Sequence, residues 1–344
     1  MSKRAFFIGG PGTLSASCIS DLLERHYQVG VFSHPSHFDE LAPEVRTYSG
    51  DRGAAGDLAA ALDDFQPDVV LDFVCYTPEQ AQAALPLVQG RVRQYIFVST
   101  VDVYGYPLSR LPFREDDPWH PETQSPYAAD KRRCEALFKA AAQAGSLPLT
   151  IARPAYSFGP RFLLSFMSRD QGLHMLRRLQ TGHPVMVPGD GATLMHAGSA
   201  FNTGRMIAAL VDAPQALGKD YTCAHPTFTT HDGYLKLFAR ALGVEPRIVH
   251  IPSDLLLSID RPEIRACLLP ALTRYNVAFS IDRFLRDFPE FCWQGTLEDW
   301  ARHVVNWNLR QGTLPAGDAA LIDDEVIAWW QAAQADLQTQ LAGR

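Results

Sequence analysis

Apolar and polar positions form alternating blocks along the first half of the chain. Short apolar runs rich in Val, Ile and Phe occupy residues 4–10, 28–33, 44–50, 68–76, 94–100 and 147–154. Patterns typical of helices lie between them at 14–26, 78–90 and 125–145. Continuous apolar runs indicate strands buried on both faces, as in a parallel sheet. Strand and helix in alternation predict an α/β fold with a doubly wound parallel sheet.

The pattern becomes less regular after about residue 155. We expect a Gly/Pro-rich loop at 183–191, helices at 202–214 and 231–243, a short strand at 246–252, and C-terminal helices at 296–312 and 324–343. Asn202 is a candidate helix cap, and Ser125 is a candidate cap of the helix predicted at 125–145.

These patterns predict a doubly wound α/β domain at 1–155, with returning segments near 190–224 and 276–312. A smaller and less regular region is expected at 156–189 and 225–275, and a helical extension at 313–344.

Composition narrows the class of protein. The 344 residues are 47% hydrophobic and 20% charged, which suits a packed globular core. The net charge of −7 argues against a surface that neutralises nucleic acid, so a nucleic-acid partner is not expected. The six cysteines are scattered without metal-binding spacing, so we expect reduced thiols, no metal and a cytoplasmic location. No apolar run is long enough to cross a membrane.

A glycine loop follows the first predicted strand. Gly9 permits a tight turn, Gly12 lets a pyrophosphate approach the backbone, and Ser15 is small where a third glycine is common. The following helix would present its N-terminus to the anion. Three small residues in a turn are a weak signal alone, but this position predicts dinucleotide binding.

The second strand ends without a carboxylate. Ser33 and His34 stand where an acid would bind the ribose hydroxyl of NAD, which favours NADP slightly over NAD. Asp51 follows the third strand, where adenine would lie, although it also suits a turn.

Tyr127 and Lys131 are four residues apart on the helix predicted at 125–145, so they share one face. A lysine ammonium favours the phenolate form of a nearby tyrosine, which can then exchange a proton with a carbinol oxygen. Thr100 and Ser99, at the end of the fifth strand, are placed to hold the same oxygen.

The motifs IGGPGTLS, STVDVYG, YAADK and RPAYSFGPR resemble the extended short-chain dehydrogenase/reductase superfamily, in its NAD-dependent epimerase/dehydratase family. The likeness covers most of the chain and is greatest to a GGTGxIS-like group. It implies that residues 1–155 form a Rossmann domain with bound NAD or NADP, that 156–189 and 225–275 form a smaller C-terminal substrate-binding domain, and that the protein is often a homodimer. It assigns catalytic roles to Thr100, Tyr127 and Lys131. Further cofactor contacts are expected at Thr13, Leu14, Arg52, Phe73, Val74 and Pro154.

Two positions depart from the family pattern. Tyr156 occupies the asparagine position of the motif RxxNxxGP, which casts doubt on a nucleotide-sugar substrate. Asn202 stands where an aspartate is usual.

Asp102 instead matches the carboxylate of sugar-nucleotide dehydratases, one methylene shorter. Beside a transient ketone it would act as a base in epimerisation or elimination, or else it caps a loop.

The resulting hypothesis is an NAD(P)-dependent epimerase or dehydratase of a sugar or sugar nucleotide. Two alternatives stay open: an NADPH-dependent reductase of a non-sugar carbonyl, and a non-catalytic protein that binds RNA or a partner. Expected substrate contacts are Tyr76, Asp102, Tyr156, Arg161, His196, Arg205 and Arg265.

Overall fold

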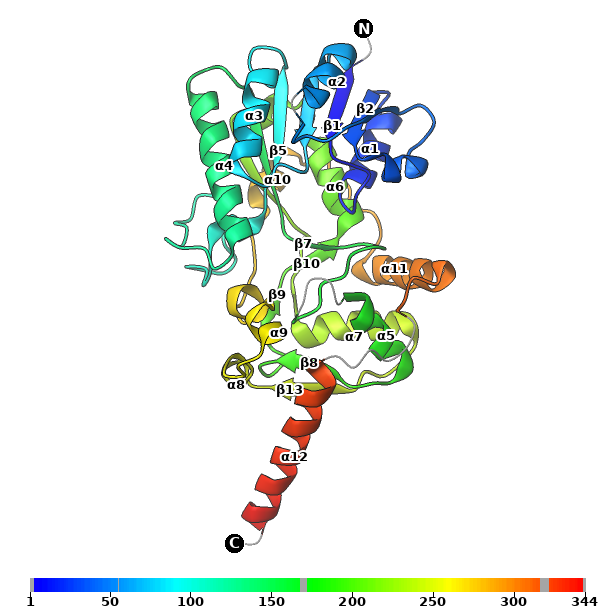
Figure 1. Cartoon of the computed structure of the whole chain (residues 1–344), viewed down its shortest axis with the longest axis vertical. Helices are drawn as coiled ribbons and strands as arrows, with labels where there is room; N and C mark the ends of the chain where they lie inside the picture. The colour runs from blue at the N-terminus through cyan, green and yellow to red at the C-terminus, as the bar shows by residue number, and fades with distance from the viewer. Residues whose placement is uncertain (1–2, 55, 168–171, 316–321, 343–344) are drawn as a thin grey trace. The chain divides into compact units, whose positions relative to one another are not determined.

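The computed structural model describes residues 3–54, 56–167, 172–315 and 322–342 (Figure 1). The chain divides into two compact units. Unit 1 comprises described residues within 1–158, 196–227 and 278–294, and unit 2 those within 159–195, 228–277 and 295–344.

A parallel sheet of seven strands forms the centre of unit 1. Its order is β11-β6-β5-β4-β1-β2-β3, and every neighbouring pair is parallel. The strands are β1 (Arg4–Ile8), β2 (Gln28–Ser33), β3 (Arg46–Ser49), β4 (Val69–Asp72), β5 (Gln94–Val98), β6 (Leu149–Pro154) and β11 (Asp220–Cys223). The fold class expected from the apolar runs, a Rossmann-like doubly wound sheet, is confirmed.

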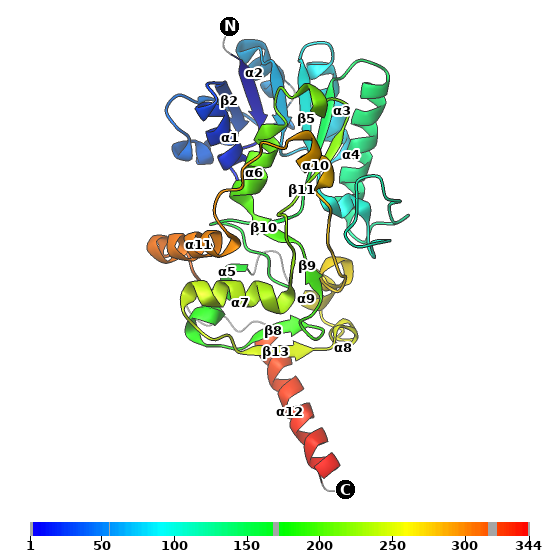
Figure 2. The same ribbon diagram turned by 180° about the vertical axis from the view of Figure 1, so that it is seen from behind.

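Helices cover the sheet of unit 1 (Figures 1 and 2). The helices α2 (Asp57–Phe65), α3 (Pro78–Val88) and α4 (Pro126–Gln143) share one buried core with the strands. The fully buried members of these helices that pack in it are Phe65, Ala81, Val88, Cys134 and Phe138. The helices α1 (Ser15–Glu24) and α6 (Ala200–Ala209) pack against each other. A two-stranded ladder joins β7 (Tyr156–Phe158) to β10 (Ala197–Ser199).

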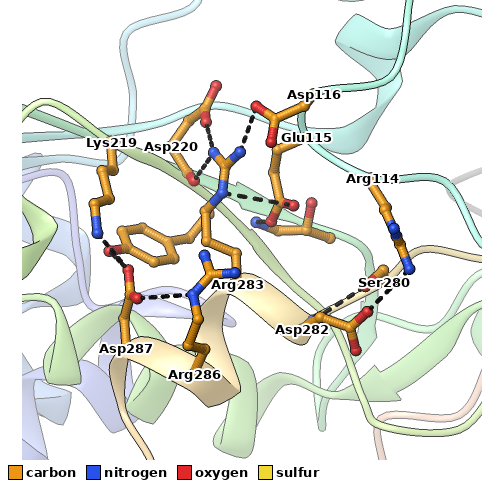
Figure 3. Close-up of polar contacts among 12 residues, drawn as sticks. Arg114, Glu115, Asp116, Lys219, Asp220, Ser280, Asp282, Arg283, Arg286 and Asp287 are labelled. Carbon is orange, nitrogen blue, oxygen red and sulfur yellow. Dashed lines mark hydrogen bonds and ion pairs between the residues drawn. The ribbon is translucent and has the colours of Figure 1, made fainter.

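Arg283 fastens the segment 278–294 to the rest of unit 1 (Figure 3). It lies in α10 (Asp282–Asp287) and pairs with Asp116 at 2.5 Å and with the Asp220 carboxylate. Glu115, a nearly buried carboxylate 4.0 Å away, accepts the Thr222 N–H at 2.8 Å. Carboxylates from two distant segments, 115–116 and the start of β11, therefore converge on one guanidinium.

Unit 2 is built from short strands and helices. These are α5 (Gly172–Thr181), β8 (Val185–Pro188), β9 (Leu194–Met195), β12 (Thr229–Thr230), α7 (His231–Leu242), β13 (Ile248–Ile251), α8 (Ser253–Leu257), α9 (Pro262–Arg265), α11 (Leu297–Gln311) and α12 (Ile322–Ala342). Val326 and Ile327 of α12 join its apolar core, whereas residues 331–342 of that helix are exposed. The helix α11 packs on α7 and belongs to unit 2, although the sequence analysis assigned 276–312 to the Rossmann domain.

Two local predictions from the sequence were wrong. Residues 183–191 were expected to form a loop, but β8 lies inside them and pairs in parallel with β13. The flanking Gly and Pro residues concealed a buried four-residue strand. The cap of α6 is Ser199, whose hydroxyl accepts the Asn202 N–H at 3.2 Å, so Asn202 lies inside the helix.

Candidate functional site

The glycine loop connects β1 to α1 in a conformation that requires glycine. Gly9 has a φ of +89°, and a Cβ atom there would lie 2.4 Å from the Val74 side chain. At Gly12, by contrast, an added Cβ would meet only the Ser15 hydroxyl, at 3.5 Å. Ser15 accepts the Gly12 N–H at 2.8 Å and closes the turn. The helix α1 has no acidic side chain in its first turn, so an anion there meets no like charge.

The ends of β2 and β3 lie side by side, with Ser33 opposite Ser49. Ser33 is half-buried, and the exposed His34 ring is 3.2 Å from the Ser36 hydroxyl. Asp51 is exposed and accepts the Gly53 N–H at 2.8 Å, which is the turn geometry anticipated as its alternative role.

Arg52, expected to contact the cofactor, forms a bidentate ion pair with Asp72. The two distances are 2.9 and 3.1 Å, and the Tyr95 hydroxyl donates to the same carboxylate at 2.7 Å. Asp72 is fully buried at the end of β4, and it also accepts the Val74 N–H at 3.2 Å. The ion pair therefore fixes the carboxylate that holds the backbone of Val74, whose side chain packs against Gly9.

Lys131 lies in a buried site lined by aromatic rings. Its ammonium is 4.8 Å from the Phe97 ring centre, 5.0 Å from that of Tyr76 and 5.9 Å from that of Tyr127. The Tyr76 and Tyr127 rings are 6.3 Å apart. Burial is the largest influence and lowers the pKa of Lys131 to about 8, while Asp72 acts in the opposite direction.

Lys131 also joins α4 to the end of β5. Its Nζ donates to the Val98 carbonyl at 2.8 Å, two residues before Thr100. The Thr100 hydroxyl accepts the Asp102 N–H at 3.2 Å. Since a hydroxyl both accepts and donates, Thr100 still has a hydrogen to offer an oxygen atom of a ligand.

Asp102 belongs to a chain of hydroxyl groups beyond β5. The Tyr106 hydroxyl donates to its carboxylate at 2.9 Å and is 3.3 Å from the Tyr156 hydroxyl. Asp102 and Tyr106 are buried, whereas Tyr156 is half-buried. Tyr156, expected to contact substrate, is therefore connected to the carboxylate.

The other expected cofactor contacts follow, or lie at the ends of, the strands β1, β4, β5 and β6 of unit 1. Thr13 and Leu14 are half-buried in the turn before α1, and the Phe73 ring stacks on Phe7 with ring centres 5.8 Å apart. Ser99 is buried and donates its N–H to the Ala152 carbonyl at 2.7 Å. Pro154 ends β6, the neighbour of β5.

His196, expected to bind substrate, is a buried link between segments. Its Nε2 is 2.6 Å from the His225 carbonyl, and its Nδ1 accepts the Phe279 N–H at 3.0 Å. Burial lowers the pKa of His196 to about 4, so the ring is neutral at pH 7.

Three arginines expected at the substrate have protein partners. Arg205 donates to the Cys292 carbonyl at 2.8 Å and pairs with Asp21 at 3.4 Å. Arg161 and Arg265 are exposed in unit 2, the former 5.8 Å from the Trp307 ring centre and the latter 2.6 Å from Asp260.

Among the described residues, no group of three or more His, Cys, Asp or Glu side chains is arranged to hold a metal ion. In the same part of the chain no helix is both long and apolar enough to cross a membrane.

The seven-stranded parallel sheet and the glycine loop between β1 and α1 have the arrangement of a Rossmann-like fold. Residues 79–224 match the model of the NAD dependent epimerase/dehydratase family, which confirms the family resemblance. Residues 79–224 are therefore similar to part of a family of NAD-dependent enzymes. No curated protein matches it.

Solved structures with this fold cover nearly all of the chain. An epimerase from Methanothermobacter thermautotrophicus is 16% identical over 91% of this chain and 94% of its own, with a TM-score of 0.74. A dTDP-glucose 4,6-dehydratase from Bacillus anthracis, solved with NAD, is 16% identical over 91% and 98%, with a TM-score of 0.72. A UDP-glucose 4-epimerase from Thermotoga maritima, solved with UDP-glucose, is 17% identical over 90% and 99%, with a TM-score of 0.69.

Sequence reasoning missed Asp72 and Tyr106. A carboxylate that ends an otherwise apolar strand was a signal for Asp72, because a buried charge needs a partner. Tyr106 gave no comparable signal, since its link to Tyr156 spans 50 positions.

Proposed function

We propose that this protein is an NAD(P)-dependent epimerase or dehydratase that acts on a sugar nucleotide through transient oxidation to a ketone. The main supporting observation is the buried Lys131 ammonium beside Tyr127, tied to the strand end that carries Thr100. The family match agrees with this reaction type. Neighbours named for dTDP-glucose and UDP-glucose support a nucleotide-linked sugar.

The residues at the carboxyl edge of the sheet fit a dinucleotide. Gly9 holds the turn, the backbone near Gly12 is open to a pyrophosphate, and α1 directs its N-terminus to that place. Lys131 would hold the ribose next to the nicotinamide. When bound, the cofactor would accept hydride from the substrate carbinol and later return it.

The chain's own residues would handle the proton of the oxidised hydroxyl. Tyr127 would take this proton, because the Lys131 ammonium favours the phenolate form. Thr100 would donate to the same oxygen. Lys131 must be charged for this role, and it loses its charge as the pH rises through about 8.

One observation favours the alternative of an NADPH-dependent carbonyl reductase. The end of β2 offers Ser33 and His34 and lacks the carboxylate that binds the ribose of NAD and would repel a 2′-phosphate. Titration of the protein with NAD and NADP in parallel would decide the cofactor. Net oxidation of NADPH by a carbonyl substrate would favour the reductase.

The test uses purified protein with NAD and, in separate reactions, dTDP-glucose, UDP-glucose and UDP-glucuronic acid. We expect a changed sugar in at least one reaction, detected by NMR. Tyr127→Phe should lower turnover by about 10²- to 10⁴-fold and leave NAD affinity within about threefold. Equal turnover by the variant would contradict the assignment. Biological activity that survives in Tyr127→Phe would favour the non-catalytic binding role.

A further inference from the structure

Three polar side chains form a connected path from the interior of unit 1 toward its surface. Asp102 lies in the short 3-10 turn after β5 and is 8% exposed. Its Oδ1 accepts the Tyr106 hydroxyl at 2.9 Å. Because Tyr106 donates to the carboxylate, its oxygen can accept the hydroxyl of Tyr156, 3.3 Å away. Tyr156 is the most exposed member.

Tyr106, the middle group of the path, is the most buried of the three. Tyr106 is only 3% exposed, and burial together with the Asp102 charge raises its pKa well above 10. Tyr106 therefore stays protonated at neutral pH and can pass a proton without holding a charge. The Asp102 carboxylate is the strongest proton acceptor of the three groups. One of its oxygens already accepts a hydrogen bond from the Tyr106 hydroxyl, so a proton that leaves Tyr106 can move directly to it.

The path lies at the edge of the sheet where the proposed reaction would take place. Tyr156 comes two residues after the end of β6, and Asp102 two residues after Thr100 at the end of β5. The strands β5 and β6 are neighbours in the sheet. Both residues thus lie at the carboxyl edge, where ligands bind in sheets of this type.

We propose that Tyr156, Tyr106 and Asp102 form a proton relay that removes the proton from the sugar carbon next to the transient ketone. Tyr156 is the group that contacts the substrate, and Tyr106 and Asp102 act through it. This inference rests on the proposed function and adds the residue for the second proton transfer.

The relay step balances in protons and charge. The C–H bond breaks, its electron pair remains on the substrate as an enolate, and the proton binds the Tyr156 oxygen. The Tyr156 proton moves to Tyr106, and the Tyr106 proton moves to Asp102, which becomes neutral. In a dehydration the same path returns the proton to the departing hydroxide, so water leaves and Asp102 regains its charge.

A ketone supplied in advance tests the relay separately from hydride transfer. The probe is dTDP-4-keto-6-deoxyglucose in D₂O, with deuterium incorporation next to the ketone followed by NMR. We expect wild-type protein to catalyse this exchange, and Tyr156→Phe, Tyr106→Phe and Asp102→Asn each to lower its rate by about 10²-fold. Exchange at the wild-type rate in Tyr156→Phe would overturn the relay.

A second arm distinguishes the relay from the proposed function. In a single turnover with dTDP-glucose and bound NAD, Tyr156→Phe should still reduce the nicotinamide, seen at 340 nm, whereas Tyr127→Phe should not. Loss of the 340 nm signal in both variants would show that Tyr156 serves hydride transfer and would contradict a relay role.

A spectroscopic titration requires neither cofactor nor substrate. Tyrosinate absorbance near 295 nm should show one tyrosine titrating at lower pH in Asp102→Asn, because the raised pKa of Tyr106 then rests on burial without the added effect of the Asp102 charge. Asp64→Asn is the matched control, since Asp64 accepts the Tyr48 hydroxyl at 2.6 Å on the exposed surface. Its deuterium exchange should equal the wild-type rate. An unchanged titration in Asp102→Asn would contradict the coupling.

Discussion

At the scale of single residues, Lys131 combines a cost to stability with a role in the proposed chemistry. It is 1% exposed, and burial lowers its pKa from 10.5 to about 8. Below pH 8 the folded protein carries a charge that the unfolded chain solvates better. Between about pH 8 and 10.5 the folded state releases its proton first, so this group's contribution to stability rises with pH.

Replacement of this lysine should therefore separate stability from activity. At pH 7 the free energy of unfolding of Lys131→Met should equal that of wild type or exceed it by up to ~3 kcal/mol. The upper value corresponds to the lowered pKa of Lys131, because the variant no longer buries a charge. Sugar turnover should fall by about 10²-fold or more. Urea unfolding and turnover assays measure both, with the exposed Lys236→Met as control. A variant that lost stability and kept activity would contradict this account.

Wild-type turnover should also depend on pH through Lys131. As the pH rises through about 8 the ammonium becomes neutral and no longer favours the Tyr127 phenolate, so we expect kcat to decline. A profile of kcat between pH 6 and 10 checks this. A kcat that stays constant to pH 10 would exclude a role for the charge.

The Arg52 and Asp72 pair illustrates the cost of a buried charge that loses its partner. Arg52→Met should lower the free energy of unfolding by about 3–5 kcal/mol, because it leaves the Asp72 carboxylate buried without its cation. Arg52→Met combined with Asp72→Asn should recover part of this loss. If Arg52 instead bound the cofactor, the single variant would weaken NAD binding at unchanged stability.

At the scale of elements, the turn from β1 to α1 depends on the close approach of two backbone segments. Gly9→Ala should lower the free energy of unfolding by about 1–3 kcal/mol, because its Cβ would overlap Val74 and its φ is positive. Gly12→Ala, with only a 3.5 Å contact, should leave stability within ~0.5 kcal/mol and weaken NAD binding. Denaturant titration measures the free energy of unfolding of both variants, and calorimetry measures their affinity for NAD. Equal stability losses would contradict this view of the turn.

Elements with a local signal were predictable from sequence, and contacts between distant segments were not. The apolar runs identified the strands of the main sheet, and the four-residue spacing placed Tyr127 and Lys131 on one helix face. The strand β8 was missed because its partner β13 is some 60 positions away. Arg52 was assigned to the cofactor since nothing in its own segment shows Asp72, which is 20 positions away.

At the scale of the whole molecule, unit 1 is assembled from three separate segments, and charges hold the last of them. Arg283→Met should lower the free energy of unfolding by about 2–4 kcal/mol, because Glu115 is left nearly buried without this cation. Arg286→Met, an exposed residue on the same helix, should change it by less than ~0.5 kcal/mol. Similar effects of the two variants on urea unfolding would contradict the role of Arg283 in holding residues 278–294.

In the proposed reaction the bound nicotinamide would be reduced and then oxidised again in each turnover, so no net cofactor would be consumed. The most direct measurement is the balance between sugar product, followed by NMR, and reduced nicotinamide, followed at 340 nm, in one reaction with a sugar nucleotide. We predict many product molecules for each bound NAD and no net accumulation of reduced cofactor. One molecule of cofactor converted for every molecule of product would contradict transient oxidation and identify a net oxidoreductase.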